Sequence, residues 1–245
     1  MARFYIAPAK WNVDRLVIEE GEAHHCLDVL RMEPGERVTV FNGLGVEATA
    51  EITTTKKERV ELKTLQHAKA PPLRCEITLA QAVPKGKNMD LIIEKATELG
   101  AAAISPLLSE RTVVHYGAGE AERKQEKWQR VAIEAAKQCG QNWLPAVHTP
   151  LSPKAFFQNS GKFDLMLIAS LQSDARPLKK ILGEVTGRLS RVLVLVGPEG
   201  DFTPAELGLA KSHGCFPMTF GPIILRTETA AIYCVSVLSH ELLGP

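Results

Sequence analysis

The sequence has no long hydrophobic run, almost no excess charge of either sign, and few cysteines. No apolar stretch reaches the roughly 18 residues of a membrane-spanning helix, and residues 1–5 do not begin an apolar secretory signal, so we expect no membrane partner. The 29 Lys and Arg residues nearly balance the 28 Asp and Glu residues, which excludes a uniformly basic nucleic-acid surface but not a local basic face. With 45% hydrophobic and 23% charged residues among 245, the composition is that of a globular protein.

The cysteines are too few and too scattered to build a disulfide framework or a zinc finger. No CxxC pair occurs, and an odd number of thiols cannot pair completely. His24 and His25 lack further ligands at a suitable spacing, so we expect no metal. We therefore expect reduced and mostly buried thiols in a cytoplasmic protein. The five are Cys26, Cys75, Cys139, Cys215 and Cys234.

Short segments with alternating polar and apolar residues characterise the first 72 residues. The expected strands cover residues 36–41, 46–52 and 60–62, with one short helix over 21–30. Asn42-Gly43 suits a tight hairpin turn, because both residues tolerate positive φ. This pattern predicts a small β-barrel over residues 1–72. The stiff Ala70-Pro71-Pro72 connector marks the expected boundary.

Strands and helices alternate over residues 73–245. Because the strands are apolar without alternation, they predict a parallel sheet covered by helices on both faces, an α/β domain. The expected strands cover residues 77–83, 103–108, 165–169, 192–196 and 216–220, and the expected helices cover 88–99, 121–139, 204–212 and 229–243.

The most informative stretch of this domain is residues 197–206, which follow a buried strand and open a helix. Thr203 and Glu206 have the spacing of a capping box. Gly197 and Gly200 allow the backbone to approach a ligand closely, and loops at the carboxyl ends of parallel strands commonly bind ligands. A tight structural turn is the alternative. The GxGxxG and P-loop patterns are absent, which argues against a dinucleotide-binding domain and a P-loop nucleotidase.

A second polar cluster lies at the start of the last helix, within residues 220–231. Arg226, Thr227, Glu228 and Thr229 precede or begin that helix, where free backbone N–H groups can receive a ligand's acceptor atoms. In the alternative interpretation one of the threonines caps the helix and Arg226 pairs with Glu228 in solvent.

Basic residues on two further loops could meet phosphates. Lys85 and Lys87 follow the first strand of the second domain and Arg111 follows the next, although solvated loop charges would look the same. Cys139 has no adjacent His to depress its pKa, which disfavours a nucleophilic role.

Several separate blocks occur together in one order and spacing. They are Gly197-Pro198-Glu199-Gly200, Leu225-Arg226-Thr227-Glu228-Thr229-Ala230, Gln138-Cys139-Gly140, residues 94–100, Ser109-Glu110-Arg111, and His25 with Val29-Leu30-Arg31. In this combination the chain resembles, over essentially its whole length, the RsmE family of bacterial ribosomal-RNA methyltransferases.

This resemblance implies a SPOUT-superfamily enzyme with a knotted C-terminal parallel sheet and a PUA-like N-terminal domain that holds RNA. It implies binding of S-adenosylmethionine (SAM), release of S-adenosylhomocysteine, and methylation of N3 of one uridine in 16S rRNA. The implied partners are 16S rRNA or the small ribosomal subunit, not DNA, and a second copy in a homodimer through the knotted domain. The alternatives are a non-catalytic PUA-like RNA-binding protein and a nucleotide-binding α/β enzyme of another chemistry.

The resemblance also implies roles for individual residues. Arg226 would stabilise negative charge on the uracil or orient the RNA, and Glu228 would organise the loop or accept the N3 proton. Gln141 and Ile223 stand where family members often carry Arg, which removes two cations near the expected RNA face. The residues expected to bind SAM are Leu171, Gly197, Glu199, Gly200, Gly221, Ile224, Leu225, Arg226, Thr229 and Ala230. Those expected to contact RNA are Arg3, Arg31, Lys85, Lys87, Arg111, Gln138 and Asn142.

Overall fold

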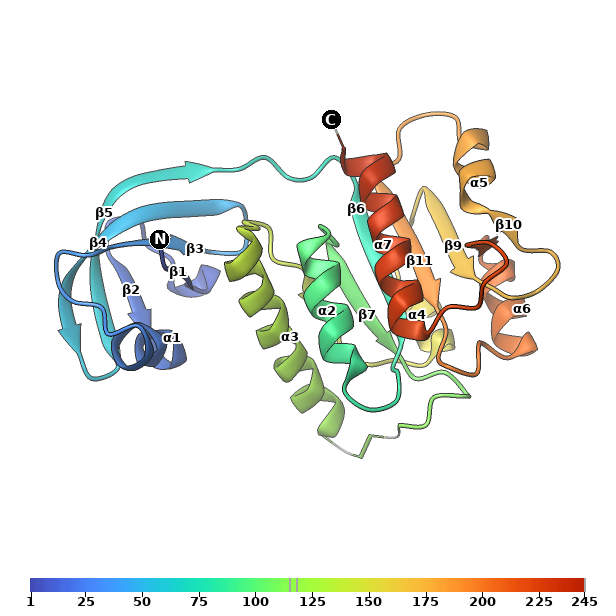
Figure 1. Ribbon diagram of the computed structural model, residues 1–245, viewed down its shortest axis with the longest axis horizontal. Helices are drawn as coiled ribbons and strands as arrows, with labels where there is room; N and C mark the ends of the chain where they lie inside the picture. The colour runs from blue at the N-terminus through green and yellow to red at the C-terminus, as the bar shows by residue number, and fades with distance from the viewer. Residues whose placement is uncertain (115, 118, 245) are drawn as a thin grey trace. The chain divides into compact units, whose positions relative to one another are not determined.

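The computed structural model describes residues 1–114, 116–117 and 119–244, and its internal contacts divide the chain into two compact units (Figure 1). Unit 1 combines Met1–Pro72 with Ile133–Leu144, and unit 2 combines Leu73–Ala132 with Pro145–Pro245. Local hydrogen bonds explain why a segment distant in sequence belongs to unit 1. The indole Nε1 of Trp143 donates to the carbonyl oxygens of Ala70 and Pro71 at 3.2 and 3.0 Å.

Unit 1 is a curled five-stranded sheet, as the alternating pattern predicts, with strand order β1-β3-β4-β5-β2. β1 pairs with β3 in parallel, and the other pairings are antiparallel. β1 and β2 have only three and four residues and were not expected from the sequence. The strands are β1 (Arg3–Tyr5), β2 (Leu16–Glu19), β3 (Arg37–Phe41), β4 (Val46–Lys56) and β5 (Arg59–Lys69), and a 3-10 turn covers Pro8–Lys10.

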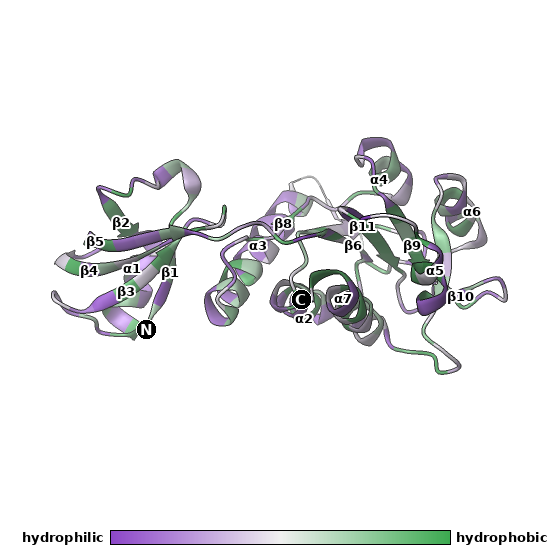
Figure 2. Cartoon of the chain, turned by 90° about the horizontal axis from the view of Figure 1, so that it is seen from above, coloured by the Kyte–Doolittle hydropathy of each residue, from purple (hydrophilic) through white to green (hydrophobic). Residues whose placement is uncertain are grey.

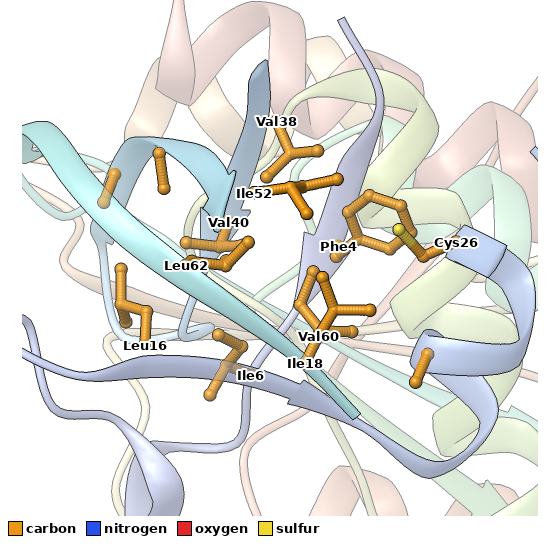
Figure 3. Close-up of a cluster of buried hydrophobic side chains, with 13 residues drawn as sticks. Phe4, Ile6, Leu16, Ile18, Cys26, Val38, Val40, Ile52, Val60 and Leu62 are labelled. Atoms are coloured by element: carbon orange, nitrogen blue, oxygen red, sulfur yellow. The ribbon is translucent and has the colours of Figure 1, made fainter. Parts of the chain in front are cut away.

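The concave side of this sheet encloses one hydrophobic core (Figure 3). Alternate residues point into it because successive side chains of a strand leave on opposite faces. Phe4, Val38, Val40 and Ile52 are essentially inaccessible to solvent. This burial of every second side chain explains why the alternating pattern of residues 36–52 predicts strands.

The connection between β3 and β4 differs from the expected tight turn. It has four residues, 42–45, and positive φ occurs at Gly43 (74°) and Gly45 (87°). The buried Asn42 side chain instead organises the loop, because its Oδ1 accepts hydrogen bonds from the backbone N–H groups of Leu44 (2.8 Å) and Val46 (3.1 Å).

The helix expected over residues 21–30 is split. It begins as α1 (Glu20–His24) and continues as a π-helical segment, His25–Val29. Arg31 follows with a left-handed backbone, φ 54°. π-helical turns and left-handed non-glycine residues are costly and often occur at functional sites.

Unit 2 contains a seven-stranded sheet of order β10-β12-β9-β11-β6-β7-β8, in which every pairing is parallel. The parallel α/β arrangement expected from the sequence is therefore confirmed. The strands are β6 (Glu76–Ala82), β7 (Ala103–Leu107), β8 (Ala146–Val147), β9 (Leu165–Ala169), β10 (Arg176–Pro177), β11 (Arg191–Val196) and β12 (Phe216–Thr219).

Helices cover both faces of this sheet. α4 (Pro153–Asn159) and α6 (Pro204–Ser212) pack on one face, where their apolar side chains join those of the strands. α2 (Asn88–Glu98) and α7 (Thr227–Leu243) lie side by side on the other, with α7 against β6 and β11 (Figure 1). The central strands are accordingly hydrophobic in Figure 2. The remaining helices are α3 (Glu120–Cys139) and α5 (Leu178–Glu184).

The longer elements of unit 2 agree with the expected bounds to within two residues, whereas β4 and β5 of unit 1 extend four and seven residues beyond the expected strands 46–52 and 60–62. β9 and α6 have the expected bounds, whereas α7 begins two residues before the expected residue 229. β8, β10, α4 and α5 were not expected, because they have at most seven residues each, too few for a clear period.

Candidate functional site

A cavity of about 770 Å³ lies in unit 2 among the loops that follow β9, β11 and β12 and the start of α7. These three strands are neighbours in the sheet, so their carboxyl ends bring the loops together at one edge. All the residues expected to bind SAM line this cavity except Thr229, which lines a separate hollow on α7. The lining members of that set are Leu171, Gly197, Glu199, Gly200, Gly221, Ile224, Leu225, Arg226 and Ala230.

The loop after β11 is held in one conformation from both ends. A Cβ on Gly197 would lie 3.2 Å from the backbone nitrogen of Phe202, so only glycine fits without displacing the loop. Asp201 has φ 61°, and its Oδ1 accepts a hydrogen bond from Phe202 N at 2.8 Å. The predicted capping box is confirmed: Thr203 Oγ1 accepts from Glu206 N, and Glu206 Oε2 accepts from Thr203 N.

Neighbouring loops add further hydrogen bonds to this one. The backbone N–H of Lys85, after β6, donates to Glu199 Oε1 at 2.9 Å. Arg111, after β7, donates from Nη1 to the carbonyl oxygen of Gly200 at 2.6 Å. Lys85 and Arg111, which are expected to contact RNA, are thus hydrogen-bonded to the loop expected to hold the cofactor.

The polar cluster at the start of α7 does not form the threonine cap and Arg226–Glu228 ion pair that were the structural alternative for this stretch. Arg226 occupies the N-cap position without a capping side-chain bond. In the part of the chain that the structure describes, Arg226 and Glu228 form no ion pair, and both line the cavity. The Thr227 hydroxyl donates to the Gly197 carbonyl oxygen at 2.6 Å, so it links two loops.

The residues expected to contact RNA are divided between the units. Lys85, Lys87 and Arg111 are exposed in unit 2, and only Lys85 lines the cavity. Arg31 and Gln138 are exposed in unit 1.

Arg3 and Asn142, the other two, contact one another within unit 1 through a side-chain hydrogen bond. The Arg3 guanidinium also bonds Glu47 at 2.9 Å and lies 4.4 Å from the centroid of the Phe41 ring. Its side chain is 13% exposed. Both terminal nitrogens of Arg3 are therefore engaged inside the unit, and among the described residues its buried Nε has no partner.

Several residues of the cavity were not identified from the sequence. Asn88 and Ser170 line it, and so do Asp201 and Thr227, which lie within the stretches 197–206 and 220–231 but were not among the residues expected to bind SAM. Asn88 and Ser170 each lie just after or near the carboxyl end of a strand, a position that is itself a signal for ligand contact. Gln81, which bonds Thr227, lies inside an apolar strand and gave no signal.

The thiols lie outside the cavity lining. Cys139 is exposed and the other four are buried, as predicted for most of them. Burial raises the pKa of Cys26 and Cys75 to about 11 and that of Cys215 to about 12. Among the described residues no group of three or more His, Cys, Asp or Glu side chains could hold a metal ion. Within the same residues, no helix is sufficiently long and apolar to span a membrane.

Comparison with known proteins decides the family. Residues 71–239 match the family described as RNA methyltransferase domain, and residues 18–65 match an RNA methyltransferase PUA domain. The chain belongs to the RNA methyltransferase family. This membership confirms the relationship expected from the separate sequence blocks, and it identifies the curled sheet of unit 1 as PUA-like.

Relatives of this RNA methyltransferase match nearly its whole length. Ribosomal RNA small subunit methyltransferase E of Bacillus subtilis is 31% identical, over 98% of this chain and 97% of the relative. The enzyme of the same name from Neisseria gonorrhoeae, solved with bound S-adenosyl methionine, has a TM-score of 0.86 and 31% identity, with 98% of each chain covered. A Legionella pneumophila methyltransferase solved with SAM has a TM-score of 0.89 and 33% identity, over 98% of this chain and 97% of that one.

Proposed function

We propose that this protein transfers a methyl group from SAM to N3 of one uridine in 16S rRNA. The observation that carries the proposal is the cavity at the carboxyl ends of β9, β11 and β12, because nine of the ten residues expected to bind SAM line it. Two relatives of matching fold are solved with SAM. Curated relatives that match 98% of this chain are named for methylation of the small-subunit RNA.

The lining suits the chemistry of SAM. Its volume, about 770 Å³, is within the usual range for small-molecule sites. Leu171, Ile224 and Leu225 provide apolar surface for the adenine. The carboxylates of Glu199 and Glu228 also line the cavity, and their charge complements the cationic sulfonium and ammonium groups.

Methylation at N3 requires an unpaired or flipped-out base, because N3 lies on the Watson–Crick edge. SAM supplies a methyl group that is already activated on a sulfonium. As the N3–methyl bond forms, the methyl–sulfur bond breaks, S-adenosylhomocysteine leaves and N3 loses its proton. We assign acceptance of that proton to Glu228. Arg226, exposed at the cavity wall, stabilises the negative charge that develops on the uracil oxygens.

Exposed basic and amide groups of both units hold the RNA. Lys85 and Arg111 are exposed beside the loop of residues 197–201 and contact phosphates. Lys87, Arg31 and Gln138 are exposed and available for further contacts. The PUA-like domain of residues 1–72 contributes to RNA binding, and residues 73–245 carry the methyl transfer.

The trefoil knot and the homodimer implied by the resemblance belong to the same proposal. The bond from Thr227 to Gly197 brings the start of α7, after β12, against the loop after β11. α7 supports the dimer: Tyr233 is 46% exposed and packs edge-on against Phe220 at 5.0 Å between ring centroids, while Phe220 lines the cavity. A second copy on this face of α7 would therefore adjoin the site.

Two measurements test the proposed function. Calorimetry of the folded protein with SAM should show binding. If it shows none, the result would favour the alternative of a non-catalytic RNA-binding protein. Mass spectrometry of 16S rRNA from a strain that lacks the gene should show one uridine without its N3 methyl group. Complementation with this chain should restore the methyl group, and complementation that leaves the RNA unchanged would refute the assignment.

A further inference from the structure

One buried hydroxyl joins three segments of unit 2 behind the cavity. Thr227 Oγ1 donates to the carbonyl oxygen of Gly197 at 2.6 Å and accepts from Gln81 Nε2 at 3.1 Å. Gln81 is inaccessible to solvent and Thr227 is 5% exposed. The carboxyl ends of β6 and β11 are thereby connected to the first turn of α7.

The direction of each hydrogen bond in this network is determined by chemistry. Gln81 Nε2 also lies 2.7 Å from the carbonyl oxygen of Ala82, which can only accept, so the nitrogen of the Gln81 amide must face both partners. The Thr227 hydroxyl has one proton, and the Gly197 carbonyl must receive it. The hydroxyl is therefore left to accept from Gln81, and no alternative arrangement satisfies all four groups.

The network costs the protein some stability. Among the residues that the structure describes, the buried Gln81 Oε1 has no hydrogen-bond partner, and an unpartnered buried acceptor is destabilising. An apolar side chain at position 81 would avoid this penalty. The presence of glutamine at position 81 is therefore explained by a role other than folding stability: its amide nitrogen orients the hydroxyl of Thr227.

We propose that Gln81 and Thr227 are positioning residues for the cofactor loop. They hold the Gly197 carbonyl against α7, and so set the path of residues 197–200 along the cavity, where Gly197, Glu199 and Gly200 lie. Neither positioning side chain needs to touch SAM. The inference rests on the proposed function, because it concerns the loop that would bind SAM.

Substitution of Thr227 tests this role. Thr227→Val keeps the shape of the side chain but leaves the Gly197 carbonyl without its hydroxyl donor and the Gln81 amide with only its bond to Ala82. We expect SAM affinity to fall about tenfold, the equivalent of one lost buried hydrogen bond, and kcat/KM for SAM to fall in parallel. Thr227→Ser keeps the hydroxyl and should restore affinity to within about twofold of wild type.

A matched control separates positioning from general stability. Thr97 is equally buried, and its hydroxyl donates to the Ile93 carbonyl at 2.8 Å within α2, outside the cavity lining. Thr97→Val should lower the melting temperature without changing SAM affinity. Gln81→Met removes the orphaned acceptor together with the donor, so it should keep or raise the melting temperature and still weaken SAM binding by about threefold.

The outcomes distinguish this inference from the proposed function. If wild-type protein does not bind SAM, the proposed function fails. If wild-type protein binds SAM while folded Thr227→Val and Gln81→Met bind it equally well, the positioning role is wrong and the network is purely structural. If Thr227→Val does not fold, Gln81→Met and Thr227→Ser still decide the question.

Discussion

Arg111 and Gly200 join two sides of the candidate site, with Arg111 Nη1 2.6 Å from the carbonyl oxygen of Gly200. The arginine is exposed and lies after β7, whereas the glycine lies in the loop after β11. One guanidinium nitrogen holds the loop, and within the described part of the chain the other donors make no side-chain hydrogen bond, so they are available for a phosphate. A residue expected to bind RNA therefore also supports the loop expected to bind SAM.

Substitution Arg111→Met should lower the affinity of the protein for both SAM and RNA. The Gly200 carbonyl loses its partner, so SAM affinity should fall roughly three- to tenfold, and RNA affinity should fall with a reduced dependence on salt. Calorimetry with SAM and RNA titrations at several salt concentrations measure the two effects. Arg123→Met, at an exposed position of α3, is the control for lost charge. SAM affinity unchanged in Arg111→Met would show that the hydrogen bond to Gly200 is dispensable.

Substitution Arg226→Ala should abolish methylation while SAM binding is largely kept. Loss of a donor that stabilises developing charge typically lowers kcat by about 10²–10³-fold. Single-turnover rates with 16S rRNA and calorimetry with SAM separate the two properties. Arg226→Lys, which keeps the positive charge, should recover part of the rate. Wild-type turnover by Arg226→Ala would remove this residue from the mechanism.

Substitution Glu228→Gln tests the assigned proton acceptor. The amide has nearly the same size as the carboxylate but no useful basicity, so the rate at neutral pH should fall by about 10²–10⁴-fold. Part of the loss should be recovered at alkaline pH, where uracil N3 ionises without help. A pH–rate profile of the variant parallel to that of wild type would argue that Glu228 only organises the loop.

Substitution Gly45→Ala should destabilise unit 1 more than Gly35→Ala does. Both glycines have positive φ, 87° and 94°, so each alanine should cost about 1–2 kcal/mol of backbone strain. A Cβ at position 45 would also lie 2.5 Å from the Trp143 ring, whereas at position 35 it meets nothing within 4 Å. The difference between the two variants in urea unfolding should be about 1–3 kcal/mol. Equal destabilisation would indicate that Trp143 does not pack on Gly45.

The thiols should differ sharply in reactivity. In the native state at mildly alkaline pH, a thiol-specific reagent should modify Cys139 alone, because burial raises the pKa of Cys26, Cys75, Cys215 and Cys234. Cys139→Ser should abolish the native reaction, and urea should expose the remaining thiols. Since the folded pKa values are raised, the unfolded chain loses these protons first, and folding stability should decline as pH rises above the ordinary thiol pKa toward about 11 to 12.

Local sequence determined much of the architecture. The start of α6 follows from its capping box, since Thr203 and Glu206 need only each other's backbone groups. The apolar runs of β9 and β11 indicate strands buried on both faces, and Ala48, Ala50 and Ile52 mark the buried face of β4. These signals depend on residues that are close in sequence. The cofactor loops were predicted from the sequence blocks shared with the RNA methyltransferase family.

Tertiary structure alone decided which distant groups meet. Asn142, expected at the RNA, bonds Arg3 inside unit 1, and Thr227, which could have capped a helix, bonds Gly197 and Gln81. The partner of a side chain depends on strand order and on which loops share a sheet edge. Residues 81, 197 and 227 become neighbours because the sheet places β6 beside β11 and because α7 packs on both strands. No periodicity along the chain encodes that contact.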